Sequence, residues 1–319
     1  MKIVYMGTPA FACQPLLALH QSKHKVVAVV TGPAKRRGRR GDPCPTEVCC
    51  SAQELGLTVL TPKGLKSPRL HDQLAALEPD LFVVVAFRIL PEKLFTLPRY
   101  GSINIHGSLL PRYRGAAPIN WALINGEKET GLTSFFLNRQ VDTGNIILQQ
   151  KIAINDNENF DSLYGRMSEM SGQFLLRTLE QIEQPDFKPL PQDDLAATPA
   201  PKLTPEDGLI DFGLPALRVK DFVRGLSTKP AAYTFFRGRK LKVLSCSVVT
   251  AAPLRIEPPG SMQIESKRLL VRCAGSTVEL TQVVPQGKNP MDGASFVNGF
   301  RPENGELLGE LRKEVKNNK

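Results

Sequence analysis

One short stretch of the chain places a carboxamide and an imidazole at a spacing that suits chemistry. It reads Asn104-Ile105-His106-Gly107-Ser108-Leu109-Leu110-Pro111 and begins inside an expected strand at residues 103–105. Residues i and i+2 of a strand point to the same face, so Asn104 and His106 would converge where a substrate can sit. The amide of Asn104 could donate to an oxyanion, and the imidazole of His106 could move a proton near neutral pH. The spacing fits equally well a strand-end asparagine beside a structurally bonded histidine.

A second segment supplies a carboxylate that could complete this pair. Residues 138–145 read Asn-Arg-Gln-Val-Asp-Thr-Gly-Asn, a turn-rich loop after another expected strand, in which Asp142 could pair with His106. A carboxylate beside an imidazole favours the protonated ring and holds its orientation. The chain has no nucleophile-elbow serine, and one His with one Asp is a thin ligand set for a metal. These groups therefore indicate that one substrate attacks another directly, with metal binding as the alternative.

The elements that must position these residues form an alternating pattern. Short apolar runs alternate with amphipathic stretches over the first 155 or so residues, which predicts a parallel sheet flanked by helices. Strands are expected at residues 2–6, 26–31, 82–86, 103–105, 132–137 and 146–154. Helices are expected at residues 9–20, 46–55, 68–77 and 160–182. Such sheets bind their ligands at the carboxyl ends of the strands.

A proline-rich segment without periodicity, residues 184–205, predicts an extended linker and a domain boundary. It separates a catalytic domain at residues 1–183 from a C-terminal domain at residues 206–319. The second domain has an expected helix at 215–226, then strands at 232–236, 241–249, 269–273 and 278–283, with a hairpin turn at 237–239. Several short strands in so few residues predict a small β-barrel, of the oligonucleotide-binding (OB) type.

Composition excludes several other classes of protein. The 319 residues are 41% hydrophobic and 23% charged, which is ordinary for a globular protein and excludes disorder as the main state. The longest apolar run spans seven residues, 81–87, far short of the roughly 18 that cross a bilayer. Six sparse cysteines predict reduced thiols, and the N-terminus leaves no room for a signal-peptide core. We therefore expect a cytoplasmic protein without membrane contacts. Its net charge of +10 favours a polyanionic partner.

The motifs around the candidate residues resemble those of the folate-dependent formyltransferases, which transfer a formyl group from 10-formyltetrahydrofolate to an amine. The matching residues of the first domain are Asn104-Ile105-His106, residues 108–115, Pro118, Trp121 and Val141-Asp142-Thr143-Gly144. Residues 6–12, residues 197–203, Gln286-Gly287-Lys288, Met291 and Phe296 extend the resemblance over essentially the whole chain, to the branch of the family that formylates methionyl-tRNA.

The resemblance implies a Rossmann-like first domain in which Asn104, His106 and Asp142 are catalytic. It implies that the α-amine of methionyl initiator tRNA attacks the formyl carbon, for translation initiation, and that no metal takes part. The pteridine would lie against the backbone of residues 85–91 and 140–144. The cofactor-binding residues implied in this way are Ala86, Phe87, Arg88, Ser108, Leu109, Leu110, Pro111, Val141 and Gly144. Family members commonly carry Ala-Tyr-Gly or Ala-Phe-Gly where this chain has Ala86-Phe87-Arg88, so Arg88 could also be a simple surface residue.

The same resemblance gives two basic clusters a role with tRNA. Lys35, Arg36, Arg37, Arg39 and Arg40 would form the loop that approaches the acceptor end, where such residues pair with phosphates or stack on unpaired bases. A second cluster around the hairpin would follow the RNA backbone and comprises Arg237, Arg239, Lys240 and Lys242. The alternatives are a solvated loop and a hairpin whose cations protect a sheet edge.

Two competing functions fit part of the sequence. One is a formyltransferase for another amine, such as a glycinamide ribonucleotide or an amino sugar, but that would need neither the basic loop nor a basic second domain. The other is a non-catalytic RNA-binding protein on an enzyme scaffold, against which the presence of all three polar residues argues. We expect a monomer.

Overall fold

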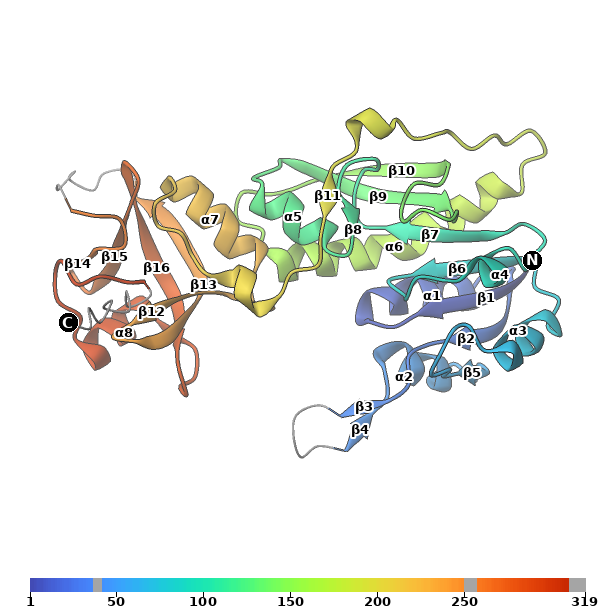
Figure 1. Cartoon of the computed structure of the whole chain (residues 1–319), viewed down its shortest axis with the longest axis horizontal. Helices are drawn as coiled ribbons and strands as arrows, with labels where there is room; N and C mark the ends of the chain where they lie inside the picture. The colour runs from blue at the N-terminus through green and yellow to red at the C-terminus, as the bar shows by residue number, and fades with distance from the viewer. Residues whose placement is uncertain (37–41, 250–256, 310–319) are drawn as a thin grey trace, which may run out of the picture. The chain divides into compact units, whose positions relative to one another are not determined.

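A computed structural model of the chain describes residues 1–36, 42–249 and 257–309 (Figure 1). It divides into two compact units that do not follow a single cut in the sequence. Unit 1 comprises residues 1–118, 129–154 and 162–201, and unit 2 comprises residues 119–128 and 155–161 together with the chain from residue 202 onward. None of the helices in the described residues is both long and apolar enough to span a bilayer.

Unit 1 contains a seven-stranded sheet in the order β10-β9-β7-β6-β1-β2-β5. Five strands run parallel: β1 (Lys2–Gly7), β2 (Lys25–Val30), β5 (Val59–Leu60), β6 (Leu81–Val85) and β7 (Ser102–His106). The other two, β9 (Glu129–Phe136) and β10 (Ile146–Ala153), form an antiparallel pair, with β9 antiparallel to β7. The expected parallel sheet is therefore mixed. Only nine residues join β9 to β10, too few for the crossover that a parallel pair needs.

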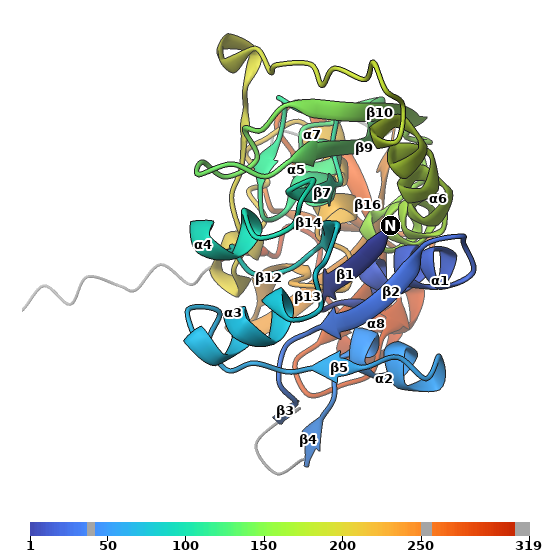
Figure 2. The same cartoon turned by 90° about the vertical axis from the view of Figure 1, so that its right-hand side faces the viewer.

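Helices cover both faces of this sheet, which gives the Rossmann-like arrangement (Figure 2). They are α1 (Cys13–His20), which follows the 3-10 turn η1 (Ala10–Ala12), then α2 (Glu47–Glu54), α3 (Pro68–Ala75), α4 (Glu92–Phe95) and α6 (Phe160–Ile182). Alternate residues of a strand face opposite sides. Val4 and Met6 accordingly pack with α3 and α4 in one apolar cluster, while the Tyr5 hydroxyl donates to Ala12 O beside α1.

The proline-rich segment is extended, as its sequence predicts, but part of it is hydrogen-bonded into unit 1. Leu190 and Ile146 exchange two backbone hydrogen bonds of 2.7 and 2.8 Å. Further on, β11 (Pro199–Ala200) follows the 3-10 turn η2 (Asp194–Ala196) and pairs in parallel with β8 (Arg114–Gly115). Another short pair, β3 (Lys35–Arg36) with β4 (Pro43–Cys44), flanks residues 37–41. None of these two-residue strands is long enough to show a sequence pattern.

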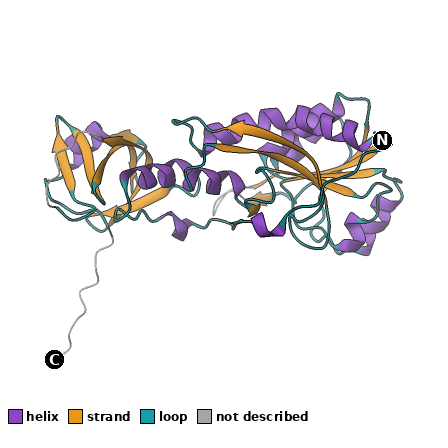
Figure 3. Cartoon of the chain, turned by 90° about the horizontal axis from the view of Figure 1, so that it is seen from above, coloured by secondary structure: helices purple, strands orange, loops and turns teal. Residues whose placement is uncertain are grey.

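Unit 2 is built on an antiparallel sheet (Figure 3). Its order is β12 (Ala232–Phe236), β13 (Arg239–Val249), β16 (Ser276–Pro285), β15 (Arg268–Cys273) and β14 (Met262–Glu265), with β17 (Met291–Asp292) also paired to β16. The helical elements are η3 (Pro205–Gly208), α7 (Ala216–Gly225), α8 (Gly293–Phe300) and, from residue 119 on, α5 (Pro118–Ile124). The expected hairpin is present, but because Phe236 lies opposite Arg239 its turn contains only Arg237 and Gly238, and Arg239 begins β13. Among the described strands β12 does not pair directly with β14, but residues 305–309 bond to residues 260–262 on one side and to Phe235 of β12 on the other.

Candidate active site

β7 holds the first two candidate residues in the interior of the sheet of unit 1. Its neighbours are β6, where Val84 lies opposite Asn104, and β9, where Phe135 lies opposite Asn104 and Thr133 opposite His106. His106 is 6% exposed, whereas Asn104 is half-buried. The carboxamide of Asn104 forms no hydrogen bond with any residue that the structure describes. An ordered amide with free donors is therefore present two residues before a buried imidazole.

The hydrogen bond of His106 determines which ring nitrogen can act on a proton. Nε2 lies 2.8 Å from the carbonyl oxygen of Tyr113, and Nδ1 lies 3.8 Å from Oδ2 of Asp142. A carbonyl can only accept, so Nε2 must carry the hydrogen of the neutral ring. The lone pair is then on Nδ1, on the side of the ring that faces the carboxylate. The structure therefore brings His106 and Asp142 together, and it assigns Nδ1 as the atom able to take up a proton.

Asp142 owes its place to an unusual backbone conformation. Its φ is +56°, in the left-handed region, which costs a non-glycine residue roughly 1–2 kcal/mol but which aspartate visits more readily than most. Oδ2 accepts a 2.9 Å hydrogen bond from the backbone N–H of Gly115. At Gly144 the loop returns so close to β9 that a Cβ would lie 1.6 Å from Phe136 O. The course of the loop thus requires glycine at position 144 and favours aspartate at position 142.

Residues 113–115 connect the two halves of the site. The carbonyl of Tyr113 holds His106, and two residues later the N–H of Gly115 holds Asp142. This segment is itself fixed by residues 198–200. Tyr113 N donates to the Thr198 hydroxyl at 2.9 Å, and a Cβ on Gly115 would meet the Ala200 carbonyl at 2.4 Å. Thr198 and Ala200 lie in the matching motif at residues 197–203, but no sequence pattern shows that they contact residues 113–115.

The residues expected to border the folate lie in two settings. Ala86 is exposed at the end of β6 with φ +47°, and Val141 is 53% exposed in the loop of Asp142. By contrast, Ser108 is fully buried and its hydroxyl donates to Arg112 O at 2.7 Å, and Leu110 is also buried, with its N–H bonded to the Thr133 hydroxyl. The side chain of Leu109 lies over Gly131. The Ser108 hydroxyl and the Leu110 side chain and N–H are therefore occupied within the protein.

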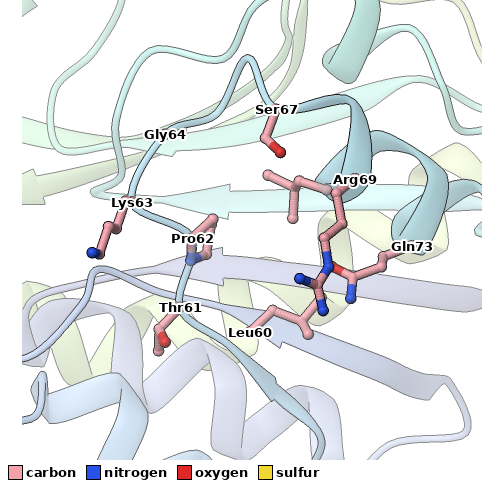
Figure 4. Close-up of a pocket in the computed structure, with 9 residues that line it drawn as sticks. Leu60, Thr61, Pro62, Lys63, Gly64, Ser67, Arg69 and Gln73 are labelled. Atoms are coloured by element: carbon pink, nitrogen blue, oxygen red, sulfur yellow. The ribbon is translucent and has the colours of Figure 1, made fainter.

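Arg88 is not a free surface residue. Its guanidinium donates to the carbonyls of Pro62 at 3.0 Å and Lys63 at 3.1 Å, and it lies 5.2 Å from the centroid of the Phe87 ring. These contacts support one wall of a hollow of about 390 Å³ after β5. Figure 4 shows its lining, in which Arg69 and Gln73 lie side by side; the other lining residues are Leu60, Thr61, Pro62, Lys63, Gly64, Ser67 and Leu70. No motif in the sequence points to this hollow.

Two of the five basic residues of the first cluster lie within the described residues. Lys35 and Arg36 are exposed on β3, whereas Arg37, Arg39 and Arg40 lie outside the described residues. As for a metal, no group of three or more His, Cys, Asp or Glu side chains able to hold an ion occurs within residues 1–36, 42–249 and 257–309.

The second basic cluster divides into engaged and open cations. Arg237 is occupied within the protein, because its guanidinium binds Glu306 at 2.7 and 3.0 Å, donates to two backbone carbonyls and lies over Phe236. Lys240 lies 3.3 Å from the centroid of the Tyr233 ring. Arg237 and Lys240 are therefore engaged within unit 2, whereas the side chains of Arg239 and Lys242 are exposed.

Comparison with known proteins gives matches over nearly the whole chain. The family described as "Formyl transferase" matches residues 1–179, and "Formyl transferase, C-terminal domain" matches residues 202–301. The methionyl-tRNA formyltransferase of Chlorobium luteolum is 43% identical over 307 residues, covering 95% of this chain and 98% of the relative. That of Caldanaerobacter subterraneus subsp. tengcongensis is 39% identical over 310 residues, covering 97% and 100%.

Solved structures share the fold at lower identity. A methionyl-tRNA formyltransferase from Clostridium thermocellum matches with a TM-score of 0.56 and 17% identity, over 79% of this chain and 95% of that one. The N-formyltransferase of Helicobacter canadensis, in complex with folinic acid and dTDP-3-aminofucose, matches with a TM-score of 0.67 and 18% identity, over 88% and 98%. At these identities the structural matches show the fold alone.

Proposed function

The chain belongs to the methionyl-tRNA formyltransferase family, and on that premise we propose that it transfers the formyl group of 10-formyltetrahydrofolate to the α-amine of methionyl initiator tRNA. One observation carries the chemical part of this proposal. The unpaired amide of Asn104 stands two residues before an imidazole whose free nitrogen, Nδ1, lies 3.8 Å from the Asp142 carboxylate. Because the site supplies a hydrogen-bond donor and a proton acceptor but no nucleophile, it suits direct transfer between two bound substrates.

The main chain beside these residues fits a flat ring with amide-like edges. The backbone groups of residues 87–89 form no hydrogen bond within the described parts of the chain, so they are available to a ligand. Across the site, the loop of Asp142 exposes Val141. We infer that these two segments hold the folate, which when bound supplies the formyl group as an N-formyl amide at N10. Ala86, immediately before the first segment, adopts a left-handed conformation with φ +47°.

The protein's own groups then have distinct roles in the transfer. His106 takes a proton from the attacking amine at Nδ1, while Tyr113 O holds the opposite side of the ring in place. Asp142 stabilises the imidazolium so formed, in the manner of the third member of a triad. Asn104 donates to the oxygen on which negative charge develops. The bond from the amine nitrogen to the formyl carbon forms, the bond from that carbon to N10 breaks, and His106 returns the proton to the leaving nitrogen.

The second unit and the basic loop would provide the affinity for tRNA. The relatives that match this chain carry a tRNA substrate in their names, and the net charge of +10 suits a polyanion. We propose contacts from Lys35 and Arg36, from Arg37, Arg39 and Arg40 beyond the described residues, and from Arg239, Lys240 and Lys242 on a sheet that would close as an OB-type barrel. A monomer acting in the cytoplasm is the simplest form consistent with these roles.

A formyl-transfer assay tests the proposal directly. Charged initiator tRNA, charged elongator methionyl-tRNA and small amines are offered in parallel with 10-formyltetrahydrofolate. We expect rapid formylation of the initiator, slower reaction with the elongator and none with glycinamide ribonucleotide or amino sugars. Preference for a small amine, or absence of transfer to either tRNA, would overturn the proposed function.

A further inference from the structure

Gln192 lies in the proline-rich segment that the sequence presents as a linker, yet its side chain reaches the candidate site. Its Nε2 donates to two backbone carbonyls of the catalytic loop, those of Asp142 at 3.0 Å and Gly144 at 2.8 Å. Its Oε1 accepts from Nε and Nη2 of Arg114 at 3.1 and 2.7 Å. All four residues belong to unit 1.

These four hydrogen bonds allow only one orientation of the amide. The two carbonyls can only accept and the guanidinium can only donate, so a reversed amide would oppose like groups on both sides. In the orientation present, both N–H donors and two acceptor positions of the carbonyl oxygen are used. The side-chain amide of Gln192 therefore has hydrogen-bond partners at both its nitrogen and its oxygen, unlike an exposed glutamine held by a single contact.

The contacts close a ring around Asp142. Arg114 is followed by Gly115, whose N–H binds the Asp142 carboxylate at 2.9 Å, and is preceded by Tyr113, whose carbonyl binds His106. Gln192 joins the Arg114 side chain to the main chain of Asp142. Gly115 thus binds the carboxylate of Asp142, and Gln192 binds its carbonyl. Both contacts connect Asp142 to residues 113–115, directly or through Arg114, and the same residues bind the imidazole.

We propose that Gln192, supported by Arg114, is a positioning residue that sets the place of the Asp142 carboxylate relative to His106 Nδ1. This inference rests on the proposed function, because a role in positioning has meaning only if Asp142 acts in the transfer. The other partner of Arg114 is Asp194 at 2.7 Å, whose side chain is 77% exposed, and a contact of that kind contributes little. Gln192 is therefore the main link between Arg114 and the loop.

Two substitutions at Gln192 distinguish positioning of the Asp142 loop from a contact with Arg114 alone. Gln192→Ala removes both sets of hydrogen bonds. Gln192→Glu keeps an acceptor for Arg114 but turns a carboxylate toward two carbonyls. It therefore preserves the contact with Arg114 and abolishes donation to the carbonyls of Asp142 and Gly144. If Gln192 positions Asp142, both variants lower kcat about 10- to 100-fold at unchanged KM for tRNA, because a small misplacement of a catalytic group is costly. Gln150→Ala is the matched control, since Gln150 on β10 also accepts from an arginine, Arg177, but away from the site.

A second measurement does not depend on activity. Hydrogen exchange of the Gly115 amide reports whether the Asp142 carboxylate still holds it, and we expect faster exchange in both Gln192 variants than in wild type or Gln150→Ala. Wild-type kcat in Gln192→Ala, a loss of kcat in the alanine variant that the glutamate variant does not share, or an effect on KM alone would each overturn the inference. If wild-type protein failed to formylate methionyl-tRNA, the proposed function would fall instead, and faster Gly115 exchange would still show that Gln192 holds the loop.

Discussion

The two halves of the candidate site are held in place by different means. Asn104 and His106 lie on β7, whose ladders with β6 and β9 fix the backbone on both sides. Asp142 lies in a loop that depends on single hydrogen bonds, from Gly115 to its carboxylate and from Gln192 to its carbonyl. A strand positions side chains through many shared bonds, whereas this loop is positioned by a few specific ones. The strand half should therefore tolerate distant changes that the loop half does not.

The largest effect is expected in the strand half, from removal of the proton-accepting group. His106→Ala should lower the single-turnover rate of transfer by about 10²- to 10⁴-fold, the usual contribution of a positioned acid or base. Folate affinity should change little, because in the proposed mechanism the imidazole acts on the reacting proton, whereas the pteridine ring of the folate is held by the main chain. Rapid-quench kinetics and a folate titration of the same variant give both values. An unchanged single-turnover rate would remove His106 from the mechanism.

A smaller effect should follow from a backbone change in the loop half. Gly144→Ala places a methyl group 1.6 Å from Phe136 O, so the loop must move and Asp142 with it. We expect kcat to fall roughly 10- to 100-fold, as for a misplaced catalytic group, and the free energy of unfolding to fall by about 1–3 kcal/mol. Gly165→Ala on α6 is the control, because nothing lies within 4 Å of its added Cβ. Equal activity in the two variants would show that the loop half tolerates a displaced backbone.

The smallest effect on chemistry is expected outside both halves. Replacing Arg36, Arg37, Arg39 and Arg40 with glutamine should reduce kcat/KM for methionyl-tRNA while leaving folate affinity and the single-turnover rate at saturation unchanged. Each arginine that pairs with a phosphate should, once replaced, flatten the slope of log affinity against log salt by roughly 0.7–0.9, whereas replacing a stacking arginine weakens binding with less change in slope. A salt titration separates the two. If kcat/KM for methionyl-tRNA and the salt slope were both unchanged, this loop would not bind tRNA, and unit 2 alone would have to do so.

The sequence predicts the strand half better than the loop half for the same physical reason. Strong periodicity identifies long elements well, and α6 and β12 have the expected bounds. The two-residue spacing of Asn104 and His106 likewise specifies a shared strand face. Two other features are not predicted from the sequence. The antiparallel edge of the sheet depends on the short connection between β9 and β10, which residue periodicity does not report. The helix α8 contains two glycines, which weaken its helical pattern.

The contacts that hold Asp142 leave no comparable signal in the sequence. The backbone N–H of Gly115 binds the Asp142 carboxylate, and the amide side chain of Gln192, 50 positions further along the chain, binds the Asp142 carbonyl. Neither residue type nor spacing indicates that Gly115 and Gln192 contact Asp142. The proline content of residues 184–205 correctly predicts an extended segment, but it does not show that part of this segment is bonded to the site.

The central claim is that Asn104, His106 and Asp142 act together on the chemical step of formyl transfer. The most direct test compares single-turnover rates of wild type, the three single alanine variants and the triple variant, at saturating 10-formyltetrahydrofolate and charged initiator tRNA. His106 and Asp142 act on one proton as a unit, so their losses should be strongly non-additive, whereas Asn104 acts on a different atom as an oxyanion donor. We predict that the triple variant is slower than His106→Ala by about the 10²- to 10³-fold factor expected for Asn104→Ala alone, with little further loss from Asp142→Ala. A triple variant slowed by the product of all three single losses would contradict the account and show that Asp142 acts independently of His106.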